Sequence, residues 1–370
     1  MKFPLKSAPH IQGKTKNSNI LATVLKAALF VAVWSIFNRF FVFGIETALH
    51  IVFMIIAACA AGTAAHVIFY YLGTLKNNDF NFSKFTQKFT TGETVVTGLI
   101  LALAMQSTSH LYAVVIVTLF AEIMGKLIFG GYGQNIFNPI AVGLVFNALA
   151  FGGTTLTVGA LPDIVSAATP LAWLNSQNWI INPYTANNFI LSSGGVLSMF
   201  LGTIPAFVGA GAIGETSRLA LVLALCYMCY KKAADWTTPV IYVGVVFIIA
   251  AVYGFFIGAG FWYPVIHILT GGVIFGAVFL ASDSVTIPFN RQGKAIFAIL
   301  LAMFTMLIRF NTSHVEGVAF SIILMNMMVP FIDSKTLNIT SKKIGAKVAS
   351  VAITFAVALI FVVGFTILFS

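Results

Sequence analysis

The sequence predicts an all-α polytopic membrane protein with about ten to eleven transmembrane helices, arranged as two inverted repeats that include half-helices. Composition is the first reason. Of the 370 residues, 59% are hydrophobic and 8% are charged, whereas a soluble domain averages about 25% charged residues. The second reason is a series of apolar stretches able to cross a bilayer core of about 30 Å. The third is a pair of short, glycine-led segments that resemble one another.

The net charge of +10 does not indicate a nucleic-acid partner. In a membrane chain such an excess usually reflects Lys and Arg on cytoplasmic loops. We therefore expect membrane lipid and other membrane subunits around this chain, and no nucleic acid.

Eleven apolar stretches follow a basic arm at residues 1–19. The arm and the first stretch could be mistaken for a signal peptide, but they run into a second span without a small-residue cleavage site, so we expect them to be retained. The third, sixth and tenth stretches are short. The stretches lie at 20–38, 45–72, 94–106, 110–129, 139–158, 217–231, 238–258, 265–282, 295–310, 317–332 and 345–369.

We expect a single membrane domain over residues 1–370. Its parts are the cytoplasmic arm, a first helical half at 20–158, a loop at 159–194, a second helical half at 195–335 and an additional C-terminal span at 345–369.

The basic residues predict the orientation. With the N-terminus in the cytoplasm, 16 of the 20 Lys and Arg fall on inner loops and inner helix ends; the exceptions are Lys26, Arg39, Arg218 and Arg309. This bias is typical of cytoplasmic loops. No Lys or Arg occurs between Lys126 and Arg218, so the 159–194 loop is predicted to lie on the outer side.

Two segments open alike. The stretch from Gly92-Glu93-Thr94 to Met105 and the stretch from Gly214-Glu215-Thr216 to Tyr227 share 7 of 14 residues, and the predicted topology runs them in opposite directions. Short glycine-led segments at corresponding positions are typical of half-helices in inverted repeats, whose N-termini face a ligand near mid-membrane. The alternative is independent use of Gly-Glu-Thr as a helix start.

Thr169 is the candidate attachment site for a cofactor. By itself Thr169-Pro170-Leu171 is a helix start, with threonine as N-cap and proline at the first helical position. However, Ser166-Ala167-Ala168-Thr169 resembles the Ser-x-Ala-Thr segment of two families, RnfD of the Rnf electron-transport complex and NqrB of the sodium-pumping NADH:quinone reductase. In those families this threonine carries FMN through a phosphoester bond. The resemblance implies covalent FMN on Thr169 beside Ser166, and it allows for a further flavin.

The resemblance extends in order over residues 5 to about 335. It is carried by seven further blocks: Ser7-Ala-Pro-His10, Gly130-Gly-Tyr-Gly-Gln-Asn-Ile-Phe-Asn-Pro139, Gly211-Ala-Ile-Gly-Glu-Thr-Ser217, His267-Ile-Leu-Thr-Gly-Gly-Val-Ile-Phe-Gly276, Ser282-Asp-Ser-Val-Thr286, Asn290-Arg-Gln-Gly293, and Glu316 to Asn326. The short N-terminal arm favours RnfD over NqrB. The span at 345–369 is absent from typical family members.

Polar residues within or beside the apolar stretches are further candidates. An ionisable side chain in a membrane is costly and suggests a function. Glu215 and Asp283 are candidates for a cation path, and Asn138 and Thr216 for flavin contacts, whereas Glu122 and Lys126 are expected to neutralise one another. We predict no catalytic residue in this chain.

The cysteines do not predict a metal site. Cys226 and Cys229 lie one helical turn apart, and Cys59 is the remaining one of three. A four-thiolate cluster therefore cannot form from this chain alone. Small apolar packing is the expected role.

The resemblance implies an FMN-bearing component of an ion-translocating ferredoxin:NAD oxidoreductase in a bacterial inner membrane, with the A, B, C, E and G components of the Rnf complex as partners. Electrons are relayed and coupled to Na⁺ or H⁺ transport. One alternative is the corresponding component of a sodium-pumping NADH:quinone reductase. Another is a channel-like transporter without redox chemistry, since fold does not fix function.

Overall fold

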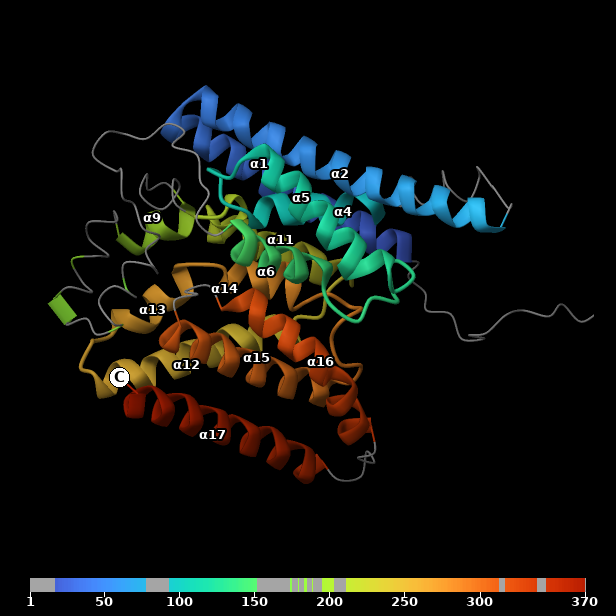
Figure 1. Ribbon diagram of the computed structural model, residues 1–370. Coiled ribbons are helices and arrows are strands. Elements are labelled where there is room, and N and C mark those ends of the chain that lie inside the picture. Colours follow the sequence, from blue (N-terminus) through green and yellow to red (C-terminus); the bar gives the residue numbers. More distant parts are fainter. Residues whose placement is uncertain are drawn as a thin grey trace, which may run out of the picture.

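The computed structural model describes residues 17–77, 93–151, 195–202, 211–312, 317–337 and 344–369, with Leu174, Trp179, Pro183, Tyr184 and Asn188. Thr169, Ser166, most of the 159–194 loop and the arm up to residue 16 lie outside the described residues. Within the described ranges every element is a helix, and an isolated bridge joins Gln106 and Ala212. Figure 1 shows the helices side by side, with α1 and α2 at one edge and α17 at the opposite edge. The predicted all-α membrane fold is confirmed.

The helices follow the apolar stretches closely. The first half contains α1 (Asn17–Phe43), α2 (Ile45–Asn77), α4 (Glu93–Ala104), α5 (Leu111–Glu122), the π-helical η1 (Ile123–Leu127) and α6 (Pro139–Phe151). After it come α9 (Gly195–Leu201), the 3-10 turn η3 (Ile213–Glu215), α11 (Arg218–Tyr230), α12 (Thr237–Phe256), α13 (Trp262–Leu269), α14 (Val273–Phe275), the π-helical η4 (Gly276–Leu280), α15 (Arg291–Asn311), α16 (Val318–Leu337) and α17 (Ile344–Phe369).

Fewer helices than expected have the length of a full span. Among the described residues, six helices are long and apolar enough to cross a membrane, or seven if one bent pair counts as a single span. The apolar helices α4, α6 and α11 have only 12 or 13 described residues. Short third and sixth helices were predicted, and both are confirmed.

Two stretches differ from the prediction. The eighth is broken: α13 and α14–η4 meet at 60°, because Thr270 is extended (φ −111°, ψ 141°) and Gly271 has a φ of +70°. The tenth is not short, since α16 has 20 residues and continues past the apolar run. Asp333 lies in this extension and accepts a hydrogen bond from the Phe289 N–H at 3.1 Å.

The two halves pack in the same order. In the first half α2 packs against α4 and α5, and α5 against α6; in the second, α12 packs against α13 and α15, and α15 against α16. The halves meet through α1 with α11 and through α6 with α16. This order matches α4 to the broken α13–α14, so the likeness between the two Gly-Glu-Thr segments does not mark corresponding helices.

Helices α1 and α11 run antiparallel, as inverted repeats require. Leu21 near the start of α1 and Met228 near the end of α11 line one pocket. At the other end of α1, Arg39 donates to the Gly211 carbonyl at 3.3 Å, just before α11.

Small residues allow α2 and α4 to approach closely. A Cβ atom at Gly98 would lie 2.7 Å from the Ala58 carbonyl oxygen, and one at Gly62 would lie 2.9 Å from that of Thr94. Such close backbone contact is common between helices in membranes, because the hydrophobic effect does not drive their association and small residues allow tight packing instead.

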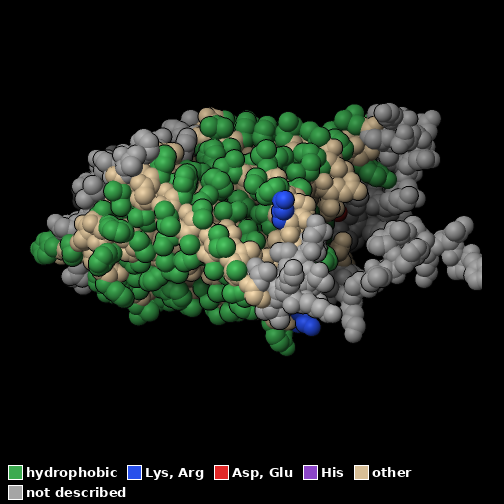
Figure 2. Space-filling model, turned by 90° about the horizontal axis from the view of Figure 1, so that it is seen from below, with side chains coloured by type: hydrophobic (Ala, Val, Ile, Leu, Met, Phe, Trp, Pro, Cys, Tyr) green, Lys and Arg blue, Asp and Glu red, His purple; other side chains and the backbone are tan. Residues whose placement is uncertain are grey.

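The surface of the protein is largely apolar. The face in Figure 2 is covered by hydrophobic side chains with isolated basic ones, as a lipid-facing or subunit-facing surface would be.

Three of the four exceptions to the charge bias lie in the protein interior. Arg39, Arg218 and Arg309 are 1%, 5% and 0% exposed. They are therefore buried structural cations rather than charges on an outer loop.

Candidate functional site

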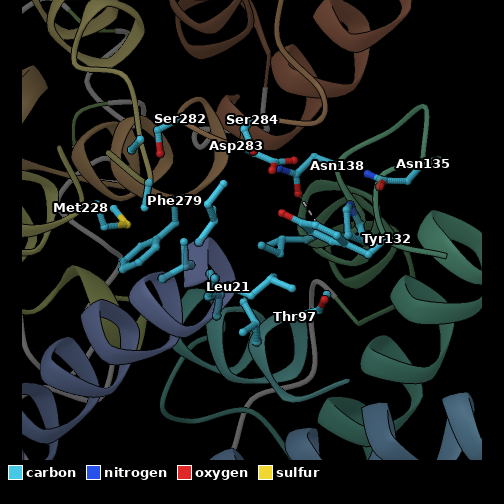
Figure 3. Close-up of a pocket in the computed structure, with 18 of the residues that line it drawn as sticks. Leu21, Thr97, Tyr132, Asn135, Asn138, Met228, Phe279, Ser282, Asp283 and Ser284 are labelled. Carbon is cyan, nitrogen blue, oxygen red and sulfur yellow. Dashed lines mark hydrogen bonds between the residues drawn. The ribbon is translucent and has the colours of Figure 1, made fainter. Parts of the chain in front are cut away.

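A pocket lies where the two halves meet, on the side that carries the start of α1 and the end of α11. It holds about 660 Å³ of empty space, including its open mouth. In Figure 3, Tyr132, Asn135, Asn138 and Asp283 gather at one end of the pocket, and Met228 and Phe279 lie at the other end with Ser282. The polar lining consists of Thr97, Lys126, Tyr132, Asn135, Asn138, Ser282, Asp283 and Ser284; the apolar lining includes Leu21, Val24, Val96, Ile100, Met228 and Phe279. By the predicted topology this side faces the cytoplasm.

The glycine-rich loop after η1 forms one wall of the pocket. Gly130, Gly131 and Gly133 have φ values of +111°, +101° and +89°, which L side chains rarely adopt. The backbone N–H of Tyr132, between them, donates to Glu93 Oε1 at 3.2 Å. The carboxylate of the first Gly-Glu-Thr segment therefore holds this loop against the start of α4.

Asn138 lines the pocket, but its polar groups mainly maintain the fold. Its Oδ1 accepts from the Ile140 N–H at 3.0 Å at the start of α6, and its Nδ2 donates to the Leu280 carbonyl at 3.3 Å. Its backbone N–H donates to Oδ1 of Asn326 on α16 at 2.9 Å. Asn138 thus ties α6, η4 and α16 together, which limits what it can offer a ligand.

Asp283 is the carboxylate of the pocket, in the loop that follows η4. It accepts hydrogen bonds from the Thr286 hydroxyl at 3.1 Å and the Val285 N–H at 3.4 Å. Burial raises the pKa of Asp283, while these hydrogen bonds and the charge of Lys126 act in the opposite direction. Burial and the Asp283 charge also raise the pKa of Tyr132, so its hydroxyl keeps its proton at neutral pH.

Lys126 joins the pocket to a buried polar cluster, which we call the inner triad: His66, Glu122 and Lys126. Lys126 Nζ is 3.3 Å from Glu122 Oε2, which is 3.1 Å from His66 Nε2, and the three residues are at most 6% exposed. Lys126 also donates to the Glu93 carbonyl at 2.8 Å and to Thr97 Oγ1 at 3.3 Å. The predicted neutralisation of Glu122 by Lys126 is confirmed, and His66 is a partner that spacing along the sequence does not reveal.

Glu215 and Thr216 lie away from the pocket, in and after η3. The Ile213 N–H donates to the Met105 carbonyl at 3.0 Å, just beyond the end of α4, whereas the pocket touches Val96 and Thr97 near its start. The 12 residues of α4 span about 18 Å, so roughly this distance separates the two places.

The surroundings of Glu215 do not favour a cation. The second Gly-Glu-Thr segment precedes its helix, because α11 begins at Arg218 with Ser217 as N-cap. Glu215 interacts electrostatically with Arg39 and Arg218, which leaves two positive charges beside one carboxylate. The Thr216 hydroxyl donates to the Ile213 carbonyl, so it stabilises the turn.

Of the six predicted site residues, the structure therefore brings Asn138 and Asp283 together and places Glu215 and Thr216 elsewhere. Thr169 and Ser166 lie outside the described residues. In the part of the chain that the structure describes, no group of three His, Cys, Asp or Glu side chains could hold a metal ion.

The chain is similar to one family of membrane proteins along most of its length. Residues 4–342 match the model of the NQR2, RnfD, RnfE family, which stops just before α17. The chain is 34% identical to the D component of the proton-translocating ferredoxin:NAD(+) oxidoreductase complex of Clostridium ljungdahlii, over 90% of this chain and 94% of that protein. It is 30% identical to the D component of the Na(+)-translocating ferredoxin:NAD(+) oxidoreductase complex of Acetobacterium woodii, over 91% and 94%. It is also 29% identical to the D component of an ion-translocating oxidoreductase complex of Actinobacillus succinogenes, over 90% and 96%.

Proposed function

Because the chain belongs to the NQR2, RnfD, RnfE family, we propose that it is the RnfD component of a membrane-bound, ion-translocating ferredoxin:NAD oxidoreductase. The observation that carries this proposal is the similarity to three relatives named as the D component of such complexes, along nine-tenths of this chain. In this role the chain relays electrons through flavin, while partner subunits react with ferredoxin and NAD. Two of these relatives are named for ferredoxin:NAD(+) oxidoreductase complexes, which favours this function over a sodium-pumping NADH:quinone reductase.

The proposed outer cofactor is FMN, attached to Thr169 through a phosphoester. The motif Ser166-Ala-Ala-Thr169 supports this assignment. The chemistry needs only an accessible hydroxyl, because the flavin is attached by its phosphate and its ring stays free for electron transfer.

Replacement of Thr169 tests the attachment. Thr169→Ala removes the hydroxyl and should abolish covalent flavin fluorescence on a denaturing gel, with the matching loss in intact mass. Thr169→Ser should retain part of the signal. Ser176→Ala is the matched control, since it removes another hydroxyl of the same loop outside this motif and should leave the flavin in place. Covalent flavin on the Thr169→Ala chain would remove Thr169 from the proposal.

The inner pocket is the proposed place for a further flavin. It is an open pocket at the junction of the two halves, lined by residues from both. The chemistry of the wall fits a flat ring with mixed polar edges: Phe279 and Met228 offer apolar contact, and Asp283 and Asn135 offer polar atoms. Lys126 adds positive charge behind them, since its ammonium already contacts Glu122, Glu93 and Thr97. A flavin there would supply one-electron and two-electron transfer, and these residues would bind and orient it.

Asp283 is also the proposed cation-binding carboxylate. It is half-buried in the pocket wall beside Thr286 and Ser284, where it combines a negative charge with nearby oxygen atoms. One relative is named for proton translocation and another for Na⁺ translocation, so the proposed cation is Na⁺ or H⁺.

A channel-like transporter without redox chemistry is the second candidate. Antiparallel halves and a broken helix are typical of secondary transporters. Covalent flavin distinguishes the two candidates, because a transporter of this kind has no use for a bound redox group.

The proposed location is a bacterial inner membrane, with the N-terminus in the cytoplasm. In a variant without native cysteines, Tyr184→Cys should react with a membrane-impermeant thiol reagent only from outside, and Lys231→Cys only from inside. Both positions are exposed. Reaction of both from the same side contradicts this orientation.

A further inference from the structure

Trp179 anchors the outer loop to the helices. Its side chain is 3% exposed, and its backbone has a φ of +61°, which is rare for a bulky residue. Its N–H donates to the Leu174 carbonyl at 3.0 Å, and its carbonyl accepts from the Tyr263 hydroxyl at 3.1 Å. The backbone of Trp179 is therefore fixed on α13.

The indole of Trp179 lies on His267, and both rings have an unused polar atom. The ring centroids are 5.4 Å apart with an interplanar angle of 26°, and Phe310 packs edge-on against the indole at 5.6 Å. Trp179 Nε1 and His267 Nε2 are buried and have no hydrogen-bond partner among the described residues. A buried polar atom without a partner is unfavourable, so two in one stack indicate that a further group belongs there.

The chemistry of the two atoms identifies that group as a hydrogen-bond acceptor. Indole Nε1–H can only donate. His267 Nδ1 is 3.5 Å from NH1 of Arg309, which also donates to the His267 carbonyl at 2.8 Å. Because a guanidinium cannot accept, Nδ1 must be the acceptor of the neutral ring, and the ring proton is then on Nε2. Both unpartnered atoms are donors, and the adjacent guanidinium adds positive charge.

We infer that Trp179 Nε1–H and His267 Nε2–H form an oxyanion site, which we call the Trp179–His267 donor site, and that it binds the phosphate of the flavin on Thr169. This inference rests on the proposed attachment of FMN. The sequence permits the contact: Thr169 is five residues from Leu174, which an extended chain spans in at most about 18 Å, and Leu174 is hydrogen-bonded to Trp179. Binding would fix the phosphate arm, and so hold the attached flavin close to α13 and α15.

Phosphorus NMR of the purified complex tests the contact directly. In the intact complex, the ester resonance should differ from that of the denatured chain. Trp179→Phe and His267→Phe keep the stacked rings but remove one donor each, and both should move the resonance toward the denatured position. Trp236→Phe is the matched control, because it removes a largely exposed indole elsewhere and should leave the resonance unchanged.

Binding of inorganic phosphate separates the site from its occupant. In the complex with Thr169→Ala, the ester is absent and free phosphate should bind. Adding Trp179→Phe should weaken this binding about ten- to a hundredfold, since one hydrogen bond to a charged group is lost. If His267→Phe prevents assembly, Trp179→Phe alone decides the result.

The outcomes distinguish the two proposals. An ester resonance and a phosphate affinity that are both unchanged by Trp179→Phe overturn the donor site, whatever the flavin does. If the wild-type chain carries no covalent flavin, the proposed attachment fails. In that case the donor site is supported if Trp179→Phe weakens the binding of inorganic phosphate, and it is refuted if inorganic phosphate does not bind.

Discussion

Removing the ammonium group of the inner triad should destabilise the protein strongly. Lys126 is 1% exposed and Glu122 is 0% exposed, with 3.3 Å between Nζ and Oε2. Lys126→Met keeps the chain length but leaves a buried carboxylate whose described partner is His66. Removing one partner of a buried pair typically costs about 3–5 kcal/mol, which changes the unfolding equilibrium about 10²- to 10⁴-fold.

A double variant separates the loss of the charge pair from the loss of packing. Glu122→Gln removes the negative charge that Lys126→Met leaves without its ammonium partner. The two changes together should therefore lower the free energy of unfolding by less than the sum of the two single changes. Coupling between contacting residues is usually about 0.5–3 kcal/mol. The control is Lys294→Met. Lys294 pairs with Asp235 at 2.7 Å, but the two side chains are 17% and 26% exposed. A pair near the surface contributes only about 0–1 kcal/mol.

Equilibrium unfolding in mixed detergent micelles, followed by tryptophan fluorescence, measures the wild type and these variants. The expected order of decreasing stability is wild type, Lys294→Met, the double variant and Lys126→Met. If Lys126→Met is no less stable than Lys294→Met, or if the double variant costs the full sum, the triad does not carry a buried charge pair.

Two further predictions concern carboxylates. Burial tends to raise the pKa of Asp235, but hydrogen bonds from Lys294 and Thr237 outweigh it and lower the pKa to about 2 from 3.8. The folded state therefore binds fewer protons than the unfolded state between about pH 4 and pH 2. The stabilisation that Asp235 contributes is present above about pH 4 and is lost as the pH falls toward 2. The difference in unfolding free energy between wild type and Asp235→Asn should shrink over that interval, and a constant difference would contradict the lowered pKa of Asp235. In vesicles with assembled complex, Asp283→Asn should lower the ratio of Na⁺ or proton uptake to ferredoxin-dependent NAD reduction. Glu215→Gln tests the second predicted cation site. Because Glu215 lies beside two arginines, its replacement should leave this ratio unchanged. An unaltered ratio in Asp283→Asn would remove Asp283 from the ion path.

The sequence predicted the helices well, because long apolar runs in a membrane have few alternatives to helix. The positions of α1, α2, α12, α15 and α17 follow directly from their hydropathy. It predicted α16 poorly, because the helix continues through Asp333 and Lys335, where the apolar signal has ended. It also missed the break between α13 and α14. Thr270-Gly271-Gly272 permits that break but does not require it.

The roles of single polar residues were harder to predict, because they depend on neighbours from distant parts of the chain. Asn138 and Asp283 were predicted as site residues and do line one pocket. However, the amide of Asn138 is used to join α6 and η4, and its backbone N–H binds Asn326, which lies 188 residues away. Glu215 met the same sequence criteria as Asp283, yet the structure surrounds it with two guanidinium groups.

The sequence by itself determined the membrane class, the helical elements, the family and the likeness around Thr169, because composition, hydropathy and ordered motifs are properties of consecutive residues. Only the tertiary structure decided which polar groups face one another. His66 meets Glu122 across 56 residues, and Trp179 stacks on His267 across 88 positions of the chain. No local sequence pattern predicts these pairs, because each forms where two elements that are distant in the chain pack together. In the membrane there is little water to bind a buried donor or charge, so the packing decides whether that group has a partner.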